Sequence, residues 1–264
     1  MPRTVVCFKS VATEADLRID PVTRAVDASR THPKISDYDR NTIEAARIAA
    51  GQLAGELVGL TFGRADARAA VKDALARGLD RAVHILAGAT TADGTDRADG
   101  HVTARVLAAQ IGRLDDVGLV LCTEGASDTY AHETGPRLGE LLGWPVVTNV
   151  RDLVIDGDRL RAVRVLGADA ETVECELPAV VTVVPEIAPA PIPGLRSVLL
   201  AGKKPTEQVA VADLDLSADA RTARTTVTSF LGFVAQRRRV LLDDGDAEHR
   251  VAALVRGLTQ DGVL

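Results

Sequence analysis

The residues best suited to hold a ligand lie between positions 119 and 145, LVLCTEGASDTYAHETGPRLGELLGWP. An apolar run typical of a buried strand ends at Cys122, and small residues at positions 125–127 follow in a polar loop. Thr134 then precedes Gly135-Pro136, as an N-cap residue with proline just inside a helix does. Free backbone N–H groups at a helix start favour an anion. The stretch therefore predicts a phosphate site, with an ordinary strand–loop–helix unit lacking a ligand as an equally good alternative.

The side chains of a catalytic site are not recognisable in the sequence. The patterns of serine hydrolases, P-loop proteins, dinucleotide-binding glycine loops and zinc peptidases are absent. Cys7, Cys122 and Cys175 lie in apolar contexts without a C-x-x-C pair. His84 alternates with apolar neighbours, which is typical of a structural histidine. We therefore expect no catalytic residues, no metal site and a binding or electron-carrying role, with a spatially assembled site as the alternative.

Composition narrows the class of protein further. The 264 residues are 46% hydrophobic but only 3% aromatic, so the core must consist of Val, Leu, Ile and Ala, as in parallel sheets covered by helices. The net charge of −6 and the scarcity of aromatics argue against a nucleic-acid binder. We found no signal peptide and no segment of membrane-spanning length. These features predict a soluble, cytoplasmic protein without membrane insertion.

The elements that must position the ligand site alternate along the chain. Short apolar runs predict strands at residues 4–8, 56–62, 82–86 and 119–122, with helices between them. This alternation predicts an α/β fold with a doubly wound, mostly parallel, Rossmann-like sheet and a ligand of nucleotide size. Ligands of such sheets bind beyond the carboxyl ends of the strands. We therefore expect the loops around Cys7, Phe62 and Cys122 to meet there, with Ser36 to Asp39 joining them from a helix start.

Local signals set the helix ends and a small hairpin. Ser36 or Asp37 can cap the first helix, which the glycines at 51–55 should break. A helix at 67–77 should end at Gly78. Further predictions are a hairpin of residues 17–19 and 25–26 around Asp20-Pro21, a solvent loop at 87–100, a helix at about 100–112, and a helix after Thr134 closed by Gly143.

The pattern changes after Pro145. Residues 150–155 and 160–166 predict an antiparallel hairpin around Asp156-Gly157-Asp158, and strands at 173–177 and 179–184 follow. The proline-rich residues 185–193 predict an extended, exposed loop, followed by the apolar residues Leu195, Val198, Leu199 and Leu200.

The last part of the chain predicts an arm instead of a further sheet unit. We expect one α/β domain at residues 1–205, with a hairpin extension at about 150–184 and an exposed loop at about 185–200. Residues 206–264 would form an extended arm with a terminal helix at about 247–258 that packs on a partner subunit. The basic run at 237–239 is most simply a solvated face.

Five motifs together resemble the beta subunit of electron transfer flavoproteins, over nearly the whole chain. They are VVCFK at 5–9, ISDYDRNxIEA at 35–45, AxxxGxDRAVH at 74–84, ETGPxLxELLGWP at 133–145 and LPAVVT at 177–182. The resemblance implies a heterodimer in which an alpha subunit holds most of the FAD and is embraced by the arm. It also implies a carrier that takes electrons from a dehydrogenase.

The resemblance further implies a fold of the adenine-nucleotide-binding type, with a pocket in the beta subunit for AMP or a second FAD. Tyr38 matches an aromatic position near the shared flavin, and Leu195 matches an exposed leucine that docks into partner dehydrogenases. The implied cofactor-binding residues are Cys7, Ser36, Asp37, Tyr38, Asp39, Phe62, Thr123, Gly125, Ala126, Ser127, Asp128, His132, Glu133 and Thr134.

The pocket loop departs from the family pattern, which reads G-K-Q-A-x-D-G-x-x-x-Q-T-G. Here Glu124 replaces the lysine, Gly125 the first glutamine and Glu133 the second. Each unpaired carboxylate could oppose a phosphate by about 1 kcal/mol or more, and a helix start favours it by roughly 0.3–2 kcal/mol. The sequence therefore leaves AMP, a second FAD or no ligand open. Val165 and Ala190-Pro191-Ile192 also depart from the pattern and indicate specialised partner recognition.

Three hypotheses of function follow. The first is an electron-carrying flavoprotein subunit in which FAD performs the redox step. The second is an AMP-binding or purely structural nucleotide-fold module without electron transfer. The third and weakest is a hydrolase-like enzyme, which the missing nucleophile set disfavours.

Overall fold

The computed structural model describes residues 1–88, 98–235 and 238–264. Its contacts divide the chain into two compact units. Unit 1 contains residues 1–18 and 27–230, and unit 2 contains residues 19–26 and 231–264. Residues 206–230, predicted as part of the arm, lie in unit 1.

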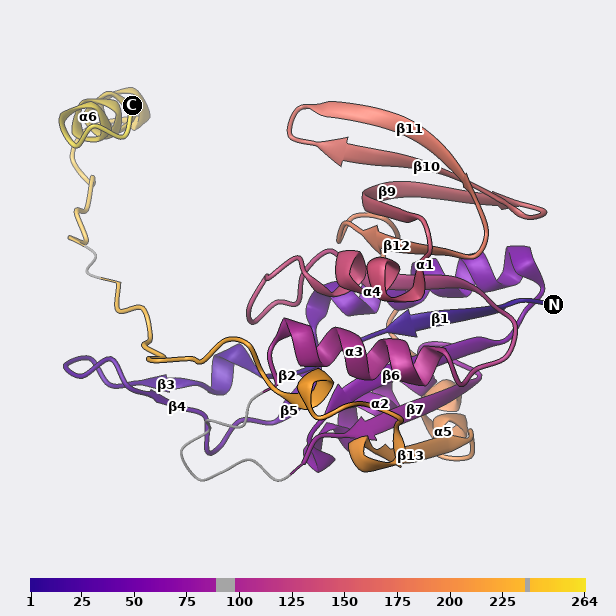
Figure 1. Cartoon of the computed structure of the whole chain (residues 1–264). Coiled ribbons are helices and arrows are strands. Elements are labelled where there is room, and N and C mark those ends of the chain that lie inside the picture. Colours follow the sequence, from indigo (N-terminus) through magenta and orange to yellow (C-terminus); the bar gives the residue numbers. More distant parts are fainter. Residues whose placement is uncertain (89–97, 236–237) are drawn as a thin grey trace. The chain divides into compact units, whose positions relative to one another are not determined.

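The described residues of unit 1 form a nine-stranded sheet in the order β11-β10-β9-β12-β8-β1-β6-β7-β13 (Figure 1). Neighbouring strands from β9 to β13 run parallel, whereas β9, β10 and β11 pair antiparallel. The predicted fold class, a doubly wound and mostly parallel sheet with an antiparallel extension, is confirmed. The strands are β1 (Arg3–Cys7), β6 (Leu57–Gly63), β7 (Arg81–Leu86), β8 (Val117–Thr123), β9 (Val146–Asp156), β10 (Arg159–Leu166), β11 (Asp169–Glu176), β12 (Ala179–Val183) and β13 (Thr206–Ala210).

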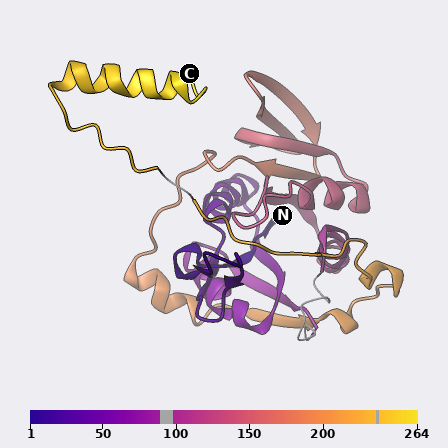
Figure 2. The same ribbon diagram turned by 90° about the vertical axis from the view of Figure 1, so that its left-hand side faces the viewer.

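Helices cover both faces of this sheet (Figure 2). Successive residues of β1 face opposite ways: Val6 belongs to the apolar cluster under α1 and α2, and Val5 to the cluster under α3 and α4. This two-sided burial explains why β1 is apolar throughout. The helices are α1 (Asp37–Leu53), α2 (Arg68–Ala76), α3 (Gly100–Ile111), α4 (Thr134–Leu142), α5 (Leu195–Ala201) and, in unit 2, α6 (Ala247–Gln260).

Short elements complete the described chain. β2 (Ser10–Ala12) pairs antiparallel with β5 (Pro33–Ile35). β3 (Arg18–Ile19) and β4 (Val26–Asp27) form the predicted hairpin, and Asp20 accepts hydrogen bonds from the backbone N–H groups of Val22 and Thr23 in its turn. Single 3-10 turns occupy Glu14–Asp16, Ala65–Ala67, Val211–Asp213 and Asp219–Arg221.

Several local predictions hold, and one is wrong. Gly78 and Gly143 follow α2 and α4 with positive φ, as predicted. The first helix ends within residues 51–55, as predicted: α1 continues through Gly51 to the buried Leu53 and has its C-cap at Ala54, with a φ of 48°. Burial of the apolar face thus outweighs the low helix propensity of one glycine. Residues 195–201, however, form α5 instead of continuing the exposed loop.

Two predictions concern residues outside the described chain. Most of the predicted solvent loop at 87–100, residues 89–97, lies outside the described residues, and so does Arg237 of the basic run. Within the described ranges, no helix combines the length and the apolar composition needed to cross a membrane.

Asp99 holds the start of α3 and a distant segment together. Its Oδ1 accepts the N–H of Val102 at 2.9 Å as the N-cap of α3. Its Oδ2 accepts the backbone N–H groups of Arg224 and Thr225 at 2.7 and 3.0 Å. One carboxylate therefore satisfies a helix end and anchors the last part of unit 1.

Replacing Asp99 by alanine should release residues 222–230 and weaken the start of α3. Loss of the cap and of the two further bonds should cost about 1–2 kcal/mol, which lowers the melting temperature by about 2–6 °C. Scanning fluorimetry measures this change, and limited proteolysis with mass spectrometry locates the new cut. Asp219→Ala is the matched control, since it removes only an exposed ion pair to Arg224. Unchanged protection of residues 222–230 in Asp99→Ala would contradict the anchoring role.

Candidate functional site

The candidate site lies where the winding of the sheet reverses. The chain proceeds from β1 to β6 and β7 on one side, and then crosses to β8 on the other side of β1. Such a switch point opens a crevice at the carboxyl ends of the two strands. Cys7 ends β1, Thr123 ends β8, and Phe62 lies near the end of β6 in the same edge.

Two cysteines form the floor of this edge. Cys7 and Cys122 follow the paired residues Val6 and Leu121 on neighbouring strands, and both are buried free thiols. A hydrogen bond with Cys7, together with burial, raises the pKa of the Cys122 thiol. Both residues pack as small core side chains, and Phe62 packs against the same apolar cluster.

Asp39 is the most perturbed charged group of the site. Its side chain is buried at the first turn of α1, and its Oδ2 accepts the backbone N–H of Lys9 at 2.8 Å. Burial raises the pKa of Asp39 to about 7, against the Lys9 hydrogen bond and charge, which lower it. The Nζ of Lys9 extends to Asp128 at 2.7 Å. The end of β1, the start of α1 and the 124–133 loop are thereby connected.

Ser36 makes a second connection between α1 and the 124–133 loop. It occupies the N-cap position of α1, as predicted, but its hydroxyl does not cap its own helix. Ser36 Oγ accepts the backbone N–H of Ser127 at 3.1 Å, and Ser127 Oγ donates to Glu14 at 3.3 Å. Asp37 is exposed and pairs with Lys34 and Arg40 at 2.8 and 2.9 Å. The structure thus brings Ser36 and Asp39 to the loop, and leaves Asp37 on the helix surface.

An aromatic cluster covers the loop. The ring of Tyr130 meets Tyr38 edge to face with centroids 5.8 Å apart, and His132 with centroids 4.2 Å apart. The Tyr130 hydroxyl donates to the carboxylate of Glu124, and this bond raises the pKa of Tyr130 to about 12. Tyr38 is half-buried.

The helix that follows the loop begins one residue earlier than predicted. Thr134 is the first residue of α4, and Glu133 occupies the N-cap position without a side-chain capping bond. Glu133 instead pairs with Arg137 at 3.0 Å, so the predicted Thr134 cap is wrong. Gly135 permits close packing, because a Cβ there would lie 2.1 Å from Cγ2 of Thr182 on β12.

The remaining predicted loop residues have mainly structural contacts. Thr123 Oγ1 donates weakly to the carbonyl of Gly125 at 3.5 Å. The carbonyl of Ala126 accepts the N–H of Tyr130 at 2.9 Å. The sequence patterns do not identify Lys9 and Tyr130 as site residues, and they mark Glu124 only as a departure from the family pattern. The position of Lys9 directly after the first strand could have revealed it, whereas the role of Tyr130 depends on the fold of the loop.

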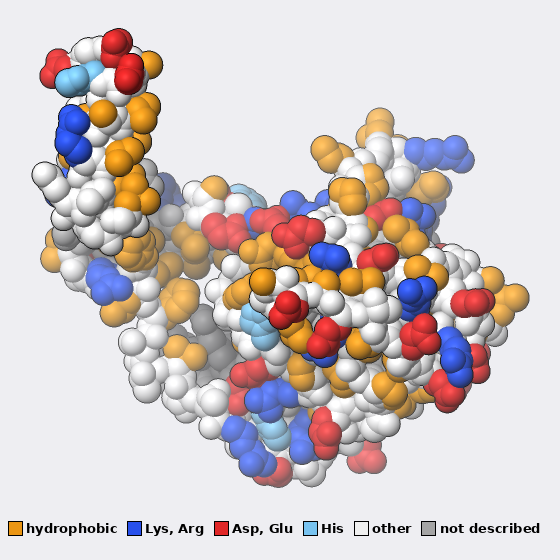
Figure 3. Space-filling view, turned by 90° about the horizontal axis from the view of Figure 1, so that it is seen from above, with side chains coloured by type: hydrophobic (Ala, Val, Ile, Leu, Met, Phe, Trp, Pro, Cys, Tyr) orange, Lys and Arg blue, Asp and Glu red, His pale blue; other side chains and the backbone are white. Residues whose placement is uncertain are grey.

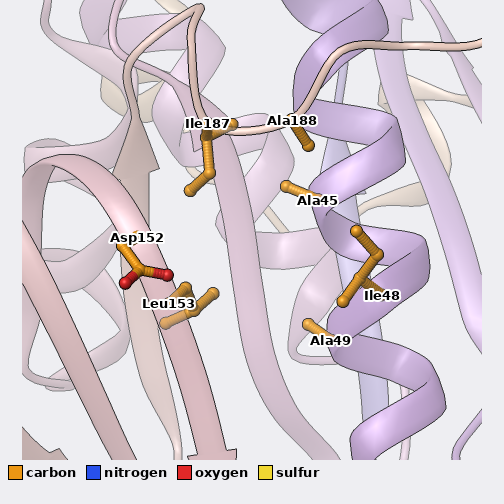
Figure 4. Close-up of a pocket in the computed structure, with 7 residues that line it drawn as sticks. All are labelled: Ala45, Ile48, Ala49, Asp152, Leu153, Ile187 and Ala188. Carbon is orange, nitrogen blue, oxygen red and sulfur yellow. The ribbon is translucent and has the colours of Figure 1, made fainter.

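A separate small hollow lies on the α1 face of the sheet. It has a volume of about 150 Å³ and is formed by α1, β9 and the segment after β12 (Figure 4). Apolar side chains form its walls, and Asp152 is its single acidic residue. The predicted site residues take no part in its lining. In the described part of the chain, no group of three or more potential ligand side chains is placed to hold a metal ion.

The sheet, its switch point and the polar loops above it define a doubly wound α/β protein with a candidate ligand site at the strand ends. The family model described as "electron transfer flavoprotein domain" matches residues 23–214, which is more than half of the chain. The chain therefore belongs to the electron transfer flavoprotein family, whose members carry electrons. The match includes Ser36 to Asp39 and the 124–133 loop, and ends before the terminal segment.

Asp39→Asn should change how stability depends on pH. The folded state holds the Asp39 proton up to about pH 7 and the unfolded state only to about 3.8. Folding is therefore progressively penalised as pH rises from about 4 to 7, by on the order of 4 kcal/mol at the upper end. The asparagine variant lacks this penalty and can still accept the Lys9 N–H. Its stability relative to the native chain should rise with pH over this window and level off above pH 7.

Urea denaturation between pH 4 and 8 measures this difference. The exposed neighbour Asp37, replaced in the same way, is the matched control and should leave the profile nearly unchanged. A constant difference between Asp39→Asn and the native chain at all pH values would contradict the elevated pKa.

Proposed function

We propose that this chain is the beta subunit of a heterodimeric electron transfer flavoprotein and works in the cytoplasm. It would shuttle electrons from a dehydrogenase to a downstream acceptor through FAD that an alpha subunit mainly holds. The family membership supports the carrier role. The observation that carries the subunit assignment is the terminal helix α6, which has no buried residue although one of its faces is apolar.

The apolar face of α6 needs a partner chain. Val251, Leu254 and Val255 are 59, 48 and 47% exposed, and Figure 3 shows hydrophobic side chains gathered along one side of this helix. A helix of 14 residues is marginal in water without packing. The preceding residues are equally apolar and exposed: Phe233, Val240, Leu241 and Leu242. Such a segment is well suited to embrace a second subunit.

Tyr38 would be the contribution of this chain to the shared flavin. Its half-buried ring meets Tyr130 edge to face, and Tyr38 is the second residue of α1. An aromatic ring in such a setting can pack against the flat ring system of FAD, so the residues present fit this group. FAD supplies the redox chemistry when bound, and the protein fixes its position and surroundings.

Leu195 would form the contact with the partner dehydrogenase. It is the first residue of α5 and is 77% exposed. Ile192 before it and Leu199 after it are also exposed. Asn41 anchors the preceding loop, because its Oδ1 accepts the N–H of Ala190 at 2.9 Å. An apolar end on an anchored segment is the usual form of a docking anchor.

Coexpression with an alpha subunit should give a yellow complex that contains FAD. Leu254→Glu places a charge on the apolar face of α6 and should weaken the affinity of the two subunits by more than about tenfold. The variant should fold normally by circular dichroism, since α6 has no buried residue of its own chain to lose. Gel filtration and the flavin absorbance of the purified complex provide the measurement.

Arg256→Glu is the matched control, because it places a glutamate at an exposed, polar position of the same helix and changes the net charge by two units, against one unit in Leu254→Glu. It should leave the complex intact. Two colourless proteins that do not associate would refute the proposed function and favour a structural nucleotide-fold module.

Leu195→Ala should slow reduction of the flavin by the partner dehydrogenase without changing flavin content. Loss of a central apolar anchor typically costs about 1–2 kcal/mol, or roughly 5–30-fold in kcat/KM for the dehydrogenase. Stopped-flow reduction measures the rate, and absorbance measures the flavin content. Leu166→Ala, at another exposed leucine on β10, is the control. An equal loss of bound flavin would show that Leu195 has a structural role.

A further inference from the structure

The 124–133 loop is folded onto itself around Tyr130. A Cβ at Gly125 would lie 2.7 Å from Cδ2 of Tyr130 and 3.1 Å from its Cα, so the tyrosine lies directly on the Gly125 backbone. The N–H of Tyr130 donates to the carbonyl of Ala126, and its ring contacts Tyr38 and His132. The space above Gly125 is therefore filled by the chain itself.

A carboxylate lies at the centre of this folded loop. Glu124 is only 9% exposed, and its Oε1 accepts the hydroxyl of Tyr130. Among the described residues, Glu124 has no ion pair with a lysine or arginine. A phosphate entering here would displace the Tyr130 hydroxyl and face a buried, uncompensated negative charge.

Three backbone N–H groups of the loop, those of Glu124, Ser127 and Tyr130, are engaged within the protein. The N–H of Glu124 donates to the carbonyl of Val183, and the N–H of Ser127 donates to Ser36 Oγ. The ammonium of Lys9 is paired with Asp128. A phosphate needs backbone N–H groups and a cation, and these three N–H groups and the Lys9 ammonium already have protein acceptors.

The backbone of the loop is held in an unfavourable conformation. Tyr130 and His132 have φ values of 45° and 55°, in the left-handed region that residues with a Cβ rarely adopt. Strain of this kind persists only when surrounding contacts impose it. The contacts of Tyr130 with Glu124, Gly125 and Tyr38 impose this conformation, so they stabilise the closed loop.

We propose that Tyr130 and Glu124 occupy the place of a nucleotide phosphate, so that this chain binds neither AMP nor a second FAD in its own pocket. The residues around the loop do not fit a phosphate, and the Glu124 carboxylate takes the position of the anion. The inference rests on the proposed function, because it concerns the pocket of a beta-type subunit.

The nucleotide content of the purified complex is the first test. Denaturation and chromatography should release FAD in a ratio of about one per heterodimer and no AMP. AMP in equal amount, or two FAD per heterodimer, would overturn the inference while leaving the proposed function intact. Absence of both complex and FAD would instead refute the proposed function, and the titration described next then decides the inference on the full chain alone.

The second test opens the loop. Isothermal titration of the full chain with AMP up to about 1 mM should show no binding. The double variant Glu124→Gln, Tyr130→Ala removes the carboxylate charge and the filling ring, and should bind AMP at least about tenfold more tightly than the native chain. Glu140→Gln, on the exposed part of α4, is the control and should behave as the native chain. Circular dichroism confirms that each variant folds.

Two outcomes of the titration would overturn the proposal. Binding of AMP by the native chain with a Kd below about 0.1 mM would show that the loop admits a nucleotide. A folded double variant that still fails to bind would show that Tyr130 and Glu124 are not what excludes it.

Discussion

The arrangement of the site depends on the buried carboxyl group of Asp39. It receives the backbone N–H of Lys9 at the point where β1 has ended, and so fixes the first turn of α1 against the strand. The side chain of the same lysine pairs with Asp128, which holds the 124–133 loop. A buried acid tolerates this position only because it is hydrogen-bonded and keeps its proton up to about pH 7. Strand, helix and loop are consequently positioned by a single cluster.

Electrostatics explains why the loop closes on itself. A helix start favours a bound phosphate by roughly 0.3–2 kcal/mol. A phosphate about 4 Å from the Glu124 carboxylate would, however, be repelled by about 4 kcal/mol at an effective dielectric constant near 20. Repulsion by the buried Glu124 is therefore larger than attraction by the helix start. A neutral tyrosine hydroxyl satisfies the carboxylate without adding charge. In the closed loop, the Glu124 carboxylate therefore takes the position that we propose for a phosphate.

The terminal segment differs from unit 1 in the burial of its apolar side chains. Unit 1 buries its apolar side chains in two clusters, one on each face of its sheet. Unit 2 contains α6, whose residues all remain unburied within the chain. Apolar surface of this kind is stabilised by transfer out of water. This is the physical basis of the proposal that a second subunit covers the segment.

The sequence by itself determined the elements that depend on local pattern. Alternating apolar runs and helical segments predicted the parallel sheet, and Gly78 and Gly143 marked helix ends because only a residue without a side chain adopts positive φ at low cost. The alternation also predicted that the segment Ser36–Asp39 and the loop after Cys122 meet at the carboxyl ends of the strands. Tertiary structure decided the rest. Burial of Leu53 extends α1 beyond Gly51. The Ser36 hydroxyl accepts the N–H of Ser127 and therefore does not cap its own helix. The partnership of Tyr130 with Glu124 needed a folded loop with two left-handed residues, and such non-local contacts leave no periodic signal in the chain.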